Sequence, residues 1–408
     1  MVRRRHLYHL AGYDPVDCAS QHRRFKRELE TFKRTWSIDA SVSPLDRSAD
    51  GSRAFWTVEA RAPGWQVESV HEPLLWDDIV RRDMERPRAL RFWHSLLAFS
   101  EFIFTGTLFR YVAASLRYAI FFLVPLVQLA LFAAAGWLVA RLLIAAFSLS
   151  GMAAVVVGWL AGIAAFFALL RWPGRRWRVE QMLSDWVFAH EYLHNRRPDL
   201  DARLDAFASA LVGQVRQRGV DEIVLVGHSM GAMLCIDVLN RALAMDAELG
   251  RRGPAVCLLT VGATIPKFTL HPAARRLRAK VERVVAEPSI SWEECQGRDD
   301  IISFYKFDPV KLTRTGERFS GKPLIRRVQL HEMLTPEAIA RHRRNYLRVH
   351  YQVVMANNKH APYDYFLMGC GPVAFRDWAP APIGLLEFMN ADGTCKASTA
   401  KPALAAQR

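Results

Sequence analysis

Residues 222–232 read Glu-Ile-Val-Leu-Val-Gly-His-Ser-Met-Gly-Ala. An apolar run typical of a buried strand leads into Gly227-His228-Ser229-Met230-Gly231, and apolar residues at helical spacing follow. This order of strand, tight turn and helix is that of a nucleophile elbow, which exposes the central serine. Small residues are needed two positions before and after the serine, because the turn brings neighbouring backbone very close. The sequence therefore predicts Ser229 as a nucleophile, with the backbone N–H of Met230 directed at a developing oxyanion.

A second motif competes with the serine motif. His190-Glu191-Tyr192-Leu193-His194 matches the HExxH pattern of zinc proteases, in which a helix presents both histidines on one face. Here Asn195 to Pro198 end the helix at once, and no clear third ligand follows at helical or strand-end spacing. The sequence thus favours serine chemistry without metal or cofactor, and makes His190 and His194 packing and capping residues. A membrane zinc metalloprotease using His190, Glu191 and His194 remains the alternative.

Two long uncharged runs predict a membrane hairpin. Residues 118–170 contain one charged side chain, Arg141, so that two spans fit at about 118–140 and 151–170. The apolar stretch from Phe92 to Leu116 could lie as a helix in the membrane interface. A soluble helical hairpin would rarely stay uncharged for so long.

Arginines are distributed unevenly around these spans. Both flanks are rich in arginine, whereas the segment between the spans has only Arg141. The positive-inside rule therefore places both flanks in the cytoplasm. The flanking residues are Arg81, Arg82, Arg86, Arg88, Arg91, Arg110 and Arg117 before the first span, and Arg171, Arg175, Arg176 and Arg178 after the second.

The charge and the cysteines fit this location. The formal net charge is +15, yet no basic motif interleaved with aromatics and no helix-turn-helix pattern appears, so we expect anionic membrane lipid and not nucleic acid as the partner. The six cysteines are scattered without a CxxC pair, which indicates ordinary thiols in a reducing compartment. The N-terminal residues lack a signal-peptide pattern.

The stretch from Val224 to Ala232 resembles the α/β-hydrolase superfamily. That resemblance implies an α/β fold with a mostly parallel sheet flanked by helices, into which the transmembrane hairpin is inserted. The stretch from His6 to Pro15 is similar to the strand and loop that supply the second oxyanion donor in that fold, which makes the backbone N–H groups of Gly12 and Tyr13 candidates. More narrowly, the chain resembles a bacterial group of membrane-inserted α/β hydrolases, which implies the bacterial inner membrane with a cytoplasmic catalytic domain.

The resemblance also orders the remaining elements. It implies an N-terminal part of the hydrolase domain at 1–90, a membrane insertion at 91–178, the C-terminal part at 179–390 and a disordered tail at 391–408. The expected elements are a helix at Cys18 to Trp36, a strand near Gln66 to Val70, a helix at Leu200 to Arg218, and strands at Val256 to Gly262, Ile290 to Gln296 and Leu324 to Leu330.

The acid is expected after the strand at Ile290 to Gln296, at the carboxyl edge of the sheet where such sites are built. The chain there reads Gly297-Arg-Asp-Asp300, and we predict Asp300 as the acid. Asp299 and Asp308 are the alternatives, and any of these carboxylates could instead cap a loop.

The base is harder to choose, because several histidines follow the last strand. Thr335-Pro-Glu opens a helical pattern that continues to Val354 and carries His350 on its apolar side. The Val-His-Tyr-Gln sequence at His350 resembles a His-aromatic-Gln stretch of the membrane-inserted group. We predict His350 as the base, with His360 and His331 as alternatives and His342 in its arginine-rich run behind them.

These observations lead to one expected function. The chain should be a membrane-anchored serine esterase or lipase that hydrolyses a small hydrophobic ester through an acyl-enzyme. The oligomeric state stays open. A catalytically inactive membrane scaffold with a hydrolase fold is the non-enzymatic alternative.

Overall fold

The computed structural model describes residues 1–48, 53–311 and 321–396, and it divides the chain into two compact units. The first unit comprises Met1–Ile79 and Arg197–Arg408, and the second comprises Val80–Arg196. The insertion expected at 91–178 lies within the second unit. In the expected tail, residues 391–396 are described, and Cys395 forms a β-bridge with Met389, which precedes the tail; residues 397–408 lie outside the described part.

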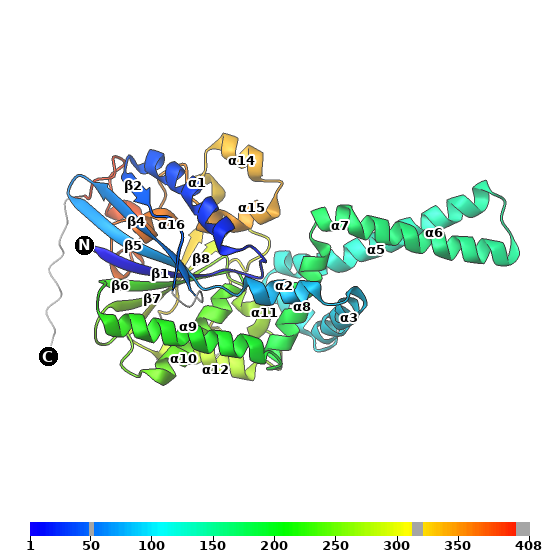
Figure 1. Ribbon diagram of the computed structural model, residues 1–408, viewed down its shortest axis with the longest axis horizontal. Helices are drawn as coiled ribbons and strands as arrows, with labels where there is room; N and C mark the ends of the chain where they lie inside the picture. The colour runs from blue at the N-terminus through cyan, green and yellow to red at the C-terminus, as the bar shows by residue number, and fades with distance from the viewer. Residues whose placement is uncertain (49–52, 312–320, 397–408) are drawn as a thin grey trace. The chain divides into compact units, whose positions relative to one another are not determined.

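A mostly parallel sheet forms the centre of the first unit (Figure 1). The described strands run in the order β2-β4-β5-β1-β6-β7-β8-β9, with β3 paired to β4. From β5 across to β9 all pairs are parallel, while β2, β3 and β4 join antiparallel at one side. The predicted fold class is confirmed. The strands are β1 Arg4–Leu10, β2 Asp39–Val42, β3 Asp46–Arg47, β4 Ala54–Ala62, β5 Trp65–Pro73, β6 Glu222–His228, β7 Ala255–Val261, β8 Ile290–Gly297 and β9 Leu324–Val328.

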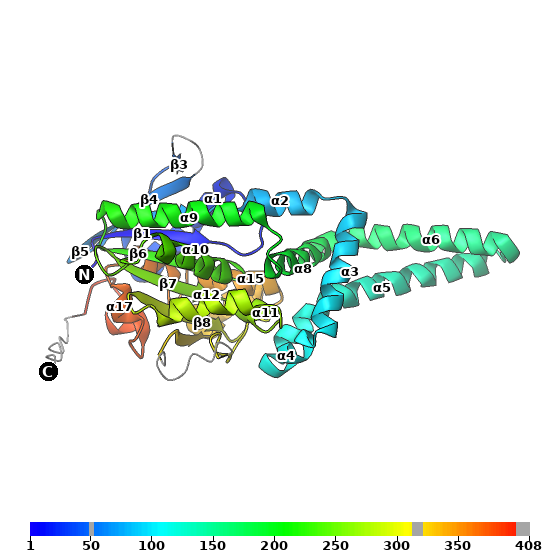
Figure 2. The same cartoon turned by 90° about the horizontal axis from the view of Figure 1, so that it is seen from below.

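Helices cover both faces of this sheet (Figures 1 and 2). One face carries α9, α10 and α12, and the other carries α1 and α16. The helices of this unit are α1 Cys18–Trp36, α9 Pro198–Gln217, α10 Gly231–Met245, α11 Ile265–Thr269, α12 Arg275–Ala286, α13 Leu330–Met333, α14 Pro336–His342, α15 Tyr346–Tyr351, α16 Tyr365–Cys370 and α17 Phe375–Trp378.

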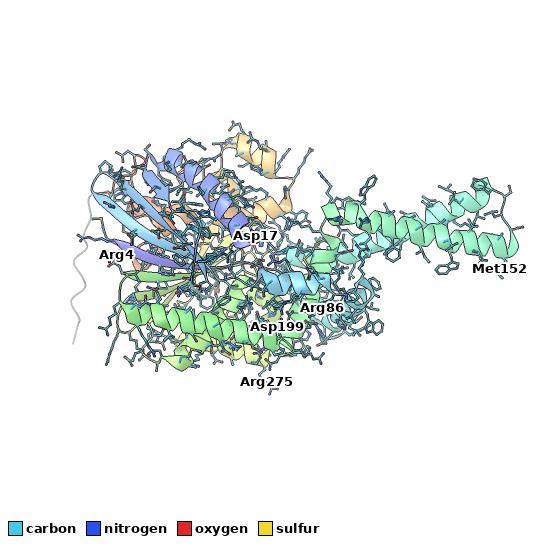
Figure 3. The ribbon with its side chains drawn as sticks, in the orientation of Figure 1. Arg4, Asp17, Arg86, Met152, Asp199 and Arg275 are labelled. Carbon is cyan, nitrogen blue, oxygen red and sulfur yellow. The ribbon has the colours of Figure 1, made fainter. Side chains whose placement is uncertain are left out.

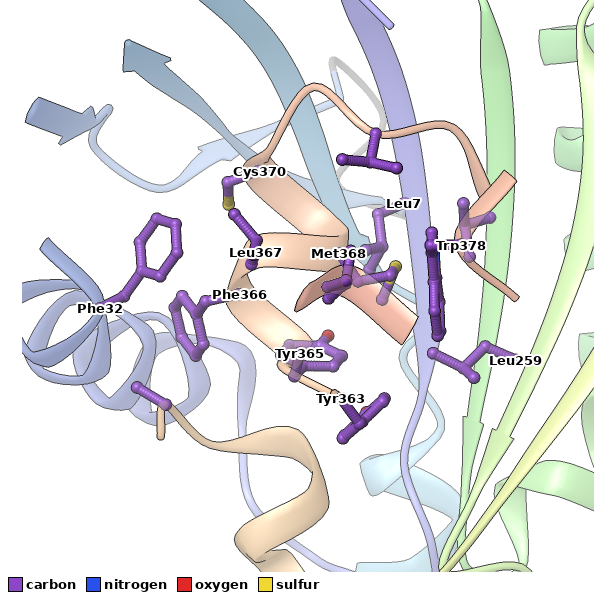
Figure 4. Packing of buried hydrophobic residues seen from close by; sticks show 14 of the residues in the cluster. Leu7, Phe32, Leu259, Tyr363, Tyr365, Phe366, Leu367, Met368, Cys370 and Trp378 are labelled. Atoms are coloured by element: carbon purple, nitrogen blue, oxygen red, sulfur yellow. The ribbon is translucent and has the colours of Figure 1, made fainter. Parts of the chain in front are cut away.

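Apolar periodicity explains why α1 lies on the sheet. Phe25, Leu29, Phe32 and Trp36 recur at spacings of three and four and are buried, and the Asp17 side chain caps the helix by accepting the Ser20 N–H. The α1 helix contacts α16, which packs its Phe366, Leu367 and Met368 against this core beside Leu7 of β1 (Figure 4). Both α1 and α16 therefore bury the same face of the central strands.

One local expectation was wrong, and three strands were missed. The expected single helix from Thr335 to Val354 is broken into α14, α15 and a short 3₁₀ turn at Gln352–Val354, because the Asn345 side chain accepts the Arg348 N–H and starts a new helix. The region before Gln66 also contains β2, β3 and β4, which the sequence analysis did not identify.

The second unit is helical, and α5 and α6 form a hairpin whose tip lies near Met152 (Figure 3). Both helices are long and apolar enough to cross a membrane. The stretch expected as one interface helix forms two helices instead, α3 and α4, with a bend of 67° between them. They would make a third span only if they were counted together as one. The helices are α2 Asp77–Glu85, which straddles the division between the units, α3 Arg88–Phe104, α4 Thr107–Ala114, α5 Leu116–Ala146, α6 Gly151–Arg171, α7 Pro173–Arg176 and α8 Val179–Leu193.

Small residues let α5 and α6 approach closely. A Cβ placed on Gly136 would lie 2.6 Å from the carbonyl oxygen of Gly162, so a larger residue there would separate the helices. The outer surface of the hairpin is exposed and apolar, and Gly158 is the one buried residue of α6. Such a surface is unstable in water and suits a lipid environment.

Candidate active site

The predicted elbow is present at the carboxyl end of β6. Ser229 has a φ of 56°, the left-handed conformation that a non-glycine residue rarely adopts. A Cβ on Gly227 would lie 2.5 Å from the Ala232 Cα, and one on Gly231 would lie 2.0 Å from the Leu10 carbonyl oxygen. Both positions therefore require glycine, for the steric reason expected from the motif.

The loop after β1 lies directly against the serine. Because β1 and β6 are parallel neighbours with Leu10 opposite Gly227, the loop that leaves β1 reaches the same sheet edge as the elbow. A Cβ on Gly12 would lie 3.2 Å from the Ser229 Oγ. Within the described residues, the backbone N–H groups of Gly12 and Met230 have no acceptor. Two donors are thus available beside the serine hydroxyl.

Asp300 and His350 form a buried pair in the same unit. The Nδ1 of His350 lies 2.7 Å from Oδ2 of Asp300, and both side chains are almost fully buried. The other carboxylate oxygen, Oδ1, accepts the Ile302 N–H at 2.9 Å, which fixes the orientation of the carboxylate. A Cβ on Gly262, which follows β7, would lie 3.3 Å from the Asp300 Oδ2 and would crowd the pair, and the φ of 53° at this position also favours glycine.

This pair and the serine meet at the carboxyl edge of β6, β7 and β8. The Ser229 N–H donates to the Val261 carbonyl, and Asp300 follows the end of β8, the neighbouring strand. The rings of His228 and His350 lie 4.5 Å apart between centroids. Among the described residues, the Ser229 Oγ makes no hydrogen bond in this conformation, as is common for catalytic contacts without substrate.

His228 is a further buried histidine that the sequence analysis did not assign. Burial, and next the neighbouring His350, hold the pKa of His228 well below its usual value, so that the ring is neutral at pH 7. Its Nε2 donates to the His350 carbonyl oxygen at 3.2 Å. This contact holds the backbone of His350 in place.

The alternative acids have other partners. Asp299 accepts the Leu330 N–H at 2.9 Å, and Asp308 accepts the Val310 N–H at 2.9 Å. Asp299 thus holds the start of α13, and Asp308 caps a local turn. In the described part of the chain neither carboxylate pairs with a histidine.

The alternative bases lie elsewhere on the first unit. His331 is exposed on α13. His360 is also exposed, and its Nε2 lies 2.6 Å from the Thr35 carbonyl oxygen while its ring packs against Trp36. His342 ends α14. Only His350 among these four pairs with a carboxylate in the structure as described.

The structure adds a link between the base and the β1 loop that the sequence did not suggest. The Tyr351 hydroxyl donates to the Asp14 carboxylate, and the Arg24 guanidinium lies 5.1 Å above the Tyr351 ring. This bond ties α15, which carries His350, to the loop that carries Gly12. The only sequence signal for this link is that Tyr351 directly follows His350 and that Asp14 lies two residues after Gly12.

The HExxH residues lie in the second unit. His190 is in the last turn of α8 and His194 is its C-cap residue, and both point their Nε2 atoms at the Glu101 carboxylate of α3. His194 therefore caps α8 as expected, and both rings also face a carboxylate, which the expected packing role did not include. Glu191 pairs with Arg86 instead, at 2.7 Å.

Comparison with known proteins gives one match. The family model described as the alpha/beta hydrolase family matches residues 187–392, just over half of the 408 residues. The matched region includes β6 to β9 and the positions of Ser229, Asp300 and His350. No curated protein and no solved structure matches the chain.

Proposed function

Because the chain belongs to the alpha/beta hydrolase family, we propose that it is a membrane-anchored serine esterase or lipase with a triad of Ser229, His350 and Asp300. The observation that supports this most strongly is the buried 2.7 Å contact between His350 and Asp300, next to the elbow serine. A carboxylate on one imidazole nitrogen fixes the tautomer that a general base needs.

In the first step, His350 accepts the Ser229 proton while Oγ bonds to the carbonyl carbon of the ester. With Nδ1 bonded to Asp300, Nε2 is the nitrogen that takes the proton. The carbonyl oxygen becomes an oxyanion, which the backbone N–H groups of Met230 and Gly12 stabilise, with Tyr13 as a further donor. Asp300 remains ionised and stabilises the imidazolium.

The tetrahedral intermediate then collapses to an acyl-enzyme. His350 donates its proton to the leaving alcohol as the carbon–oxygen bond breaks, and the neutral imidazole next deprotonates a water molecule. The water oxygen bonds to the acyl carbon, and Ser229 recovers its proton from His350 as the carboxylic acid leaves. The cycle needs neither metal nor cofactor.

The apolar hairpin supports a membrane location and a hydrophobic substrate. The 31 residues of α5 extend about 46 Å, more than the roughly 30 Å of a hydrocarbon core. An enzyme held at such a surface meets lipid-soluble esters at high local concentration. We therefore propose a hydrophobic ester as substrate, membrane lipid as partner, and a catalytic unit on the cytoplasmic side of a bacterial inner membrane.

Labelling with a fluorophosphonate is the direct test of the serine mechanism. We expect the purified protein in detergent to bind one probe per chain, because the probe reacts only with an activated serine. Labelling should persist after treatment with a chelator. Esters of increasing acyl length should then define the preferred chain. Absence of labelling in folded protein would contradict the proposal and favour a scaffold.

The topology can be tested with single cysteines. In a Cys395→Ser background the native cysteines are all buried, so Ser148→Cys and Arg176→Cys variants each offer one exposed thiol. An impermeant maleimide added outside intact spheroplasts should modify Cys at 148 and leave Cys at 176 unmodified, since positive flanks stay cytoplasmic. Lysed spheroplasts provide the control, where both positions should react. Modification of position 176 from outside would show that the topology is the reverse of the proposed one.

A further inference from the structure

Three ligand-type side chains converge in the second unit, remote in sequence from the elbow. His190 in the last turn of α8 and His194, the C-cap residue, are four positions apart, and their ring centroids lie 4.9 Å apart. The Glu101 carboxylate from α3 lies between them, with one oxygen 2.7 Å from the His190 Nε2 and the other 2.6 Å from the His194 Nε2. Glu101 is also the only carboxylate between residues 92 and 116, an otherwise apolar stretch. A single carboxylate in such a stretch indicates that Glu101 has a specific binding partner.

We propose that Glu101, His190 and His194 bind a divalent transition metal, with Zn²⁺ as the preferred ion. Two imidazole nitrogens and a carboxylate oxygen are a donor set that zinc takes in proteins, and histidines at i and i+4 are the usual way for a helix to supply two of them. The donor atoms all lie within 4.8 Å of one another.

The geometry requires little movement to accept the ion. Ligands about 2.0–2.1 Å from a tetrahedral zinc lie about 3.3 Å from one another. The two nitrogen–oxygen distances of 2.7 and 2.6 Å would therefore open by less than about 1 Å, and no pair of the donor atoms, which all lie within 4.8 Å of one another, would have to close by more than about 1.5 Å. The side chains of Glu101, His190 and His194 are 30%, 13% and 25% exposed, respectively. The ion and a water molecule as fourth ligand can therefore enter the site.

The surroundings of Glu191 assign a structural and not a proteolytic role to this metal. In a zinc protease the glutamate of HExxH is the general base for the metal-bound water. Here the Glu191 carboxylate pairs with Arg86 at 2.7 Å, and Arg86 also pairs with Asp83 at 2.8 Å. Glu191 is not one of the clustered ligands. The ion thus connects α3 to α8 and stabilises the helical unit that carries the hairpin.

Metal analysis of the full-length protein tests this assignment. The protein should be purified in detergent through a tag without histidines, because nickel resin could load the site. After incubation with Zn²⁺ and removal of free ion, we expect one zinc per chain and a higher melting temperature, which a chelator reverses. The metal-free protein should still react with a fluorophosphonate, since Ser229 does not use the ion.

Matched variants distinguish a metal site from a hydrogen-bonded cluster. Glu101→Gln keeps the shape and can still hydrogen-bond both histidines, but it lacks the anionic ligand. We expect Glu101→Gln and His190→Ala to bind zinc at least about 100-fold more weakly, more than the loss of an outer-shell partner costs. Glu191→Gln and His94→Ala, a histidine of α3 outside the cluster, should bind it normally.

Three outcomes would overturn the proposal. One is the absence of zinc binding in the folded wild-type protein, and another is unchanged binding in Glu101→Gln and His190→Ala. The third is zinc-dependent peptide cleavage that Glu191→Gln abolishes, which would assign the motif to proteolysis instead. Circular dichroism of Glu101→Gln verifies that the variant is folded, so that weaker zinc binding cannot be attributed to unfolding.

Discussion

Replacement of Ser229 by alanine should abolish fluorophosphonate labelling and lower the rate of ester hydrolysis by about 10⁶-fold. The serine supplies the atom that bonds to the substrate, so no neighbouring group can replace it. Stability should change little, because the Ser229 Oγ has no hydrogen-bond partner among the described residues and its removal leaves none unpaired. Steady-state kinetics and thermal melting of the same preparation measure both effects.

A serine distant from the elbow provides the control. Ser209 is exposed on α9 and donates to the Asp205 carbonyl oxygen within the helix, so Ser209→Ala should retain full activity and labelling. Wild-type activity in Ser229→Ala would exclude Ser229 as the nucleophile. Labelling that survives in this variant would show that the probe reacts at another residue.

The second large effect is expected at the base. His350→Gln should reduce the rate by at least about 1,000-fold with the protein still folded, because a general base contributes powers of ten that packing alone does not. His350 is the histidine that pairs with a buried carboxylate, whereas His360 contacts the Thr35 carbonyl oxygen and His331 is exposed. His360→Gln and His331→Gln should therefore lose much less activity.

The comparison of these variants can reverse the assignment. If His360→Gln lost the large factor while His350→Gln only lowered the melting temperature, His350 would be a core residue of α15 and His360 the base. Asp300→Asn separates the two cases further. If the buried pair orients the imidazole, Asp300→Asn should lower the rate of ester hydrolysis, as His350→Gln does.

Local sequence patterns predict the elbow directly, whereas they leave several alternatives for its partners. The strand, turn and helix around Ser229 are contiguous, so periodicity and two glycines suffice to identify them. His350 and Asp300 are 50 residues apart. The apolar helical pattern and the Val-His-Tyr-Gln resemblance favour His350 over His360, but neither shows which histidine reaches Asp300. Which histidine reaches Asp300 depends on the break between α14 and α15. The Asn345 side chain caps the new helix α15, and the direction of α15 determines where His350 points.

Contacts between distant segments account for the other gaps. Glu101 precedes His190 by 89 residues, so a search for a third ligand after the HExxH motif could not find it. The short strands β2 and β3 are defined by antiparallel pairing with β4 and have little apolar alternation of their own. Such strands form because they pair with a neighbouring strand, and the pattern of a single sequence does not show which segments pair.

The position of β1 in the sheet has a consequence for the order of biosynthesis. The strand lies between β5 and β6, and the ion pair of Arg5 with Glu222 joins residues 217 positions apart. At 5–20 residues per second, a ribosome needs roughly 10–40 s to make the chain between them. During that time α5 and α6 are synthesised, while the backbone N–H and C=O groups of β1 that pair with β6 have no strand to bind. The apolar hairpin therefore leaves the ribosome before the centre of the sheet can close.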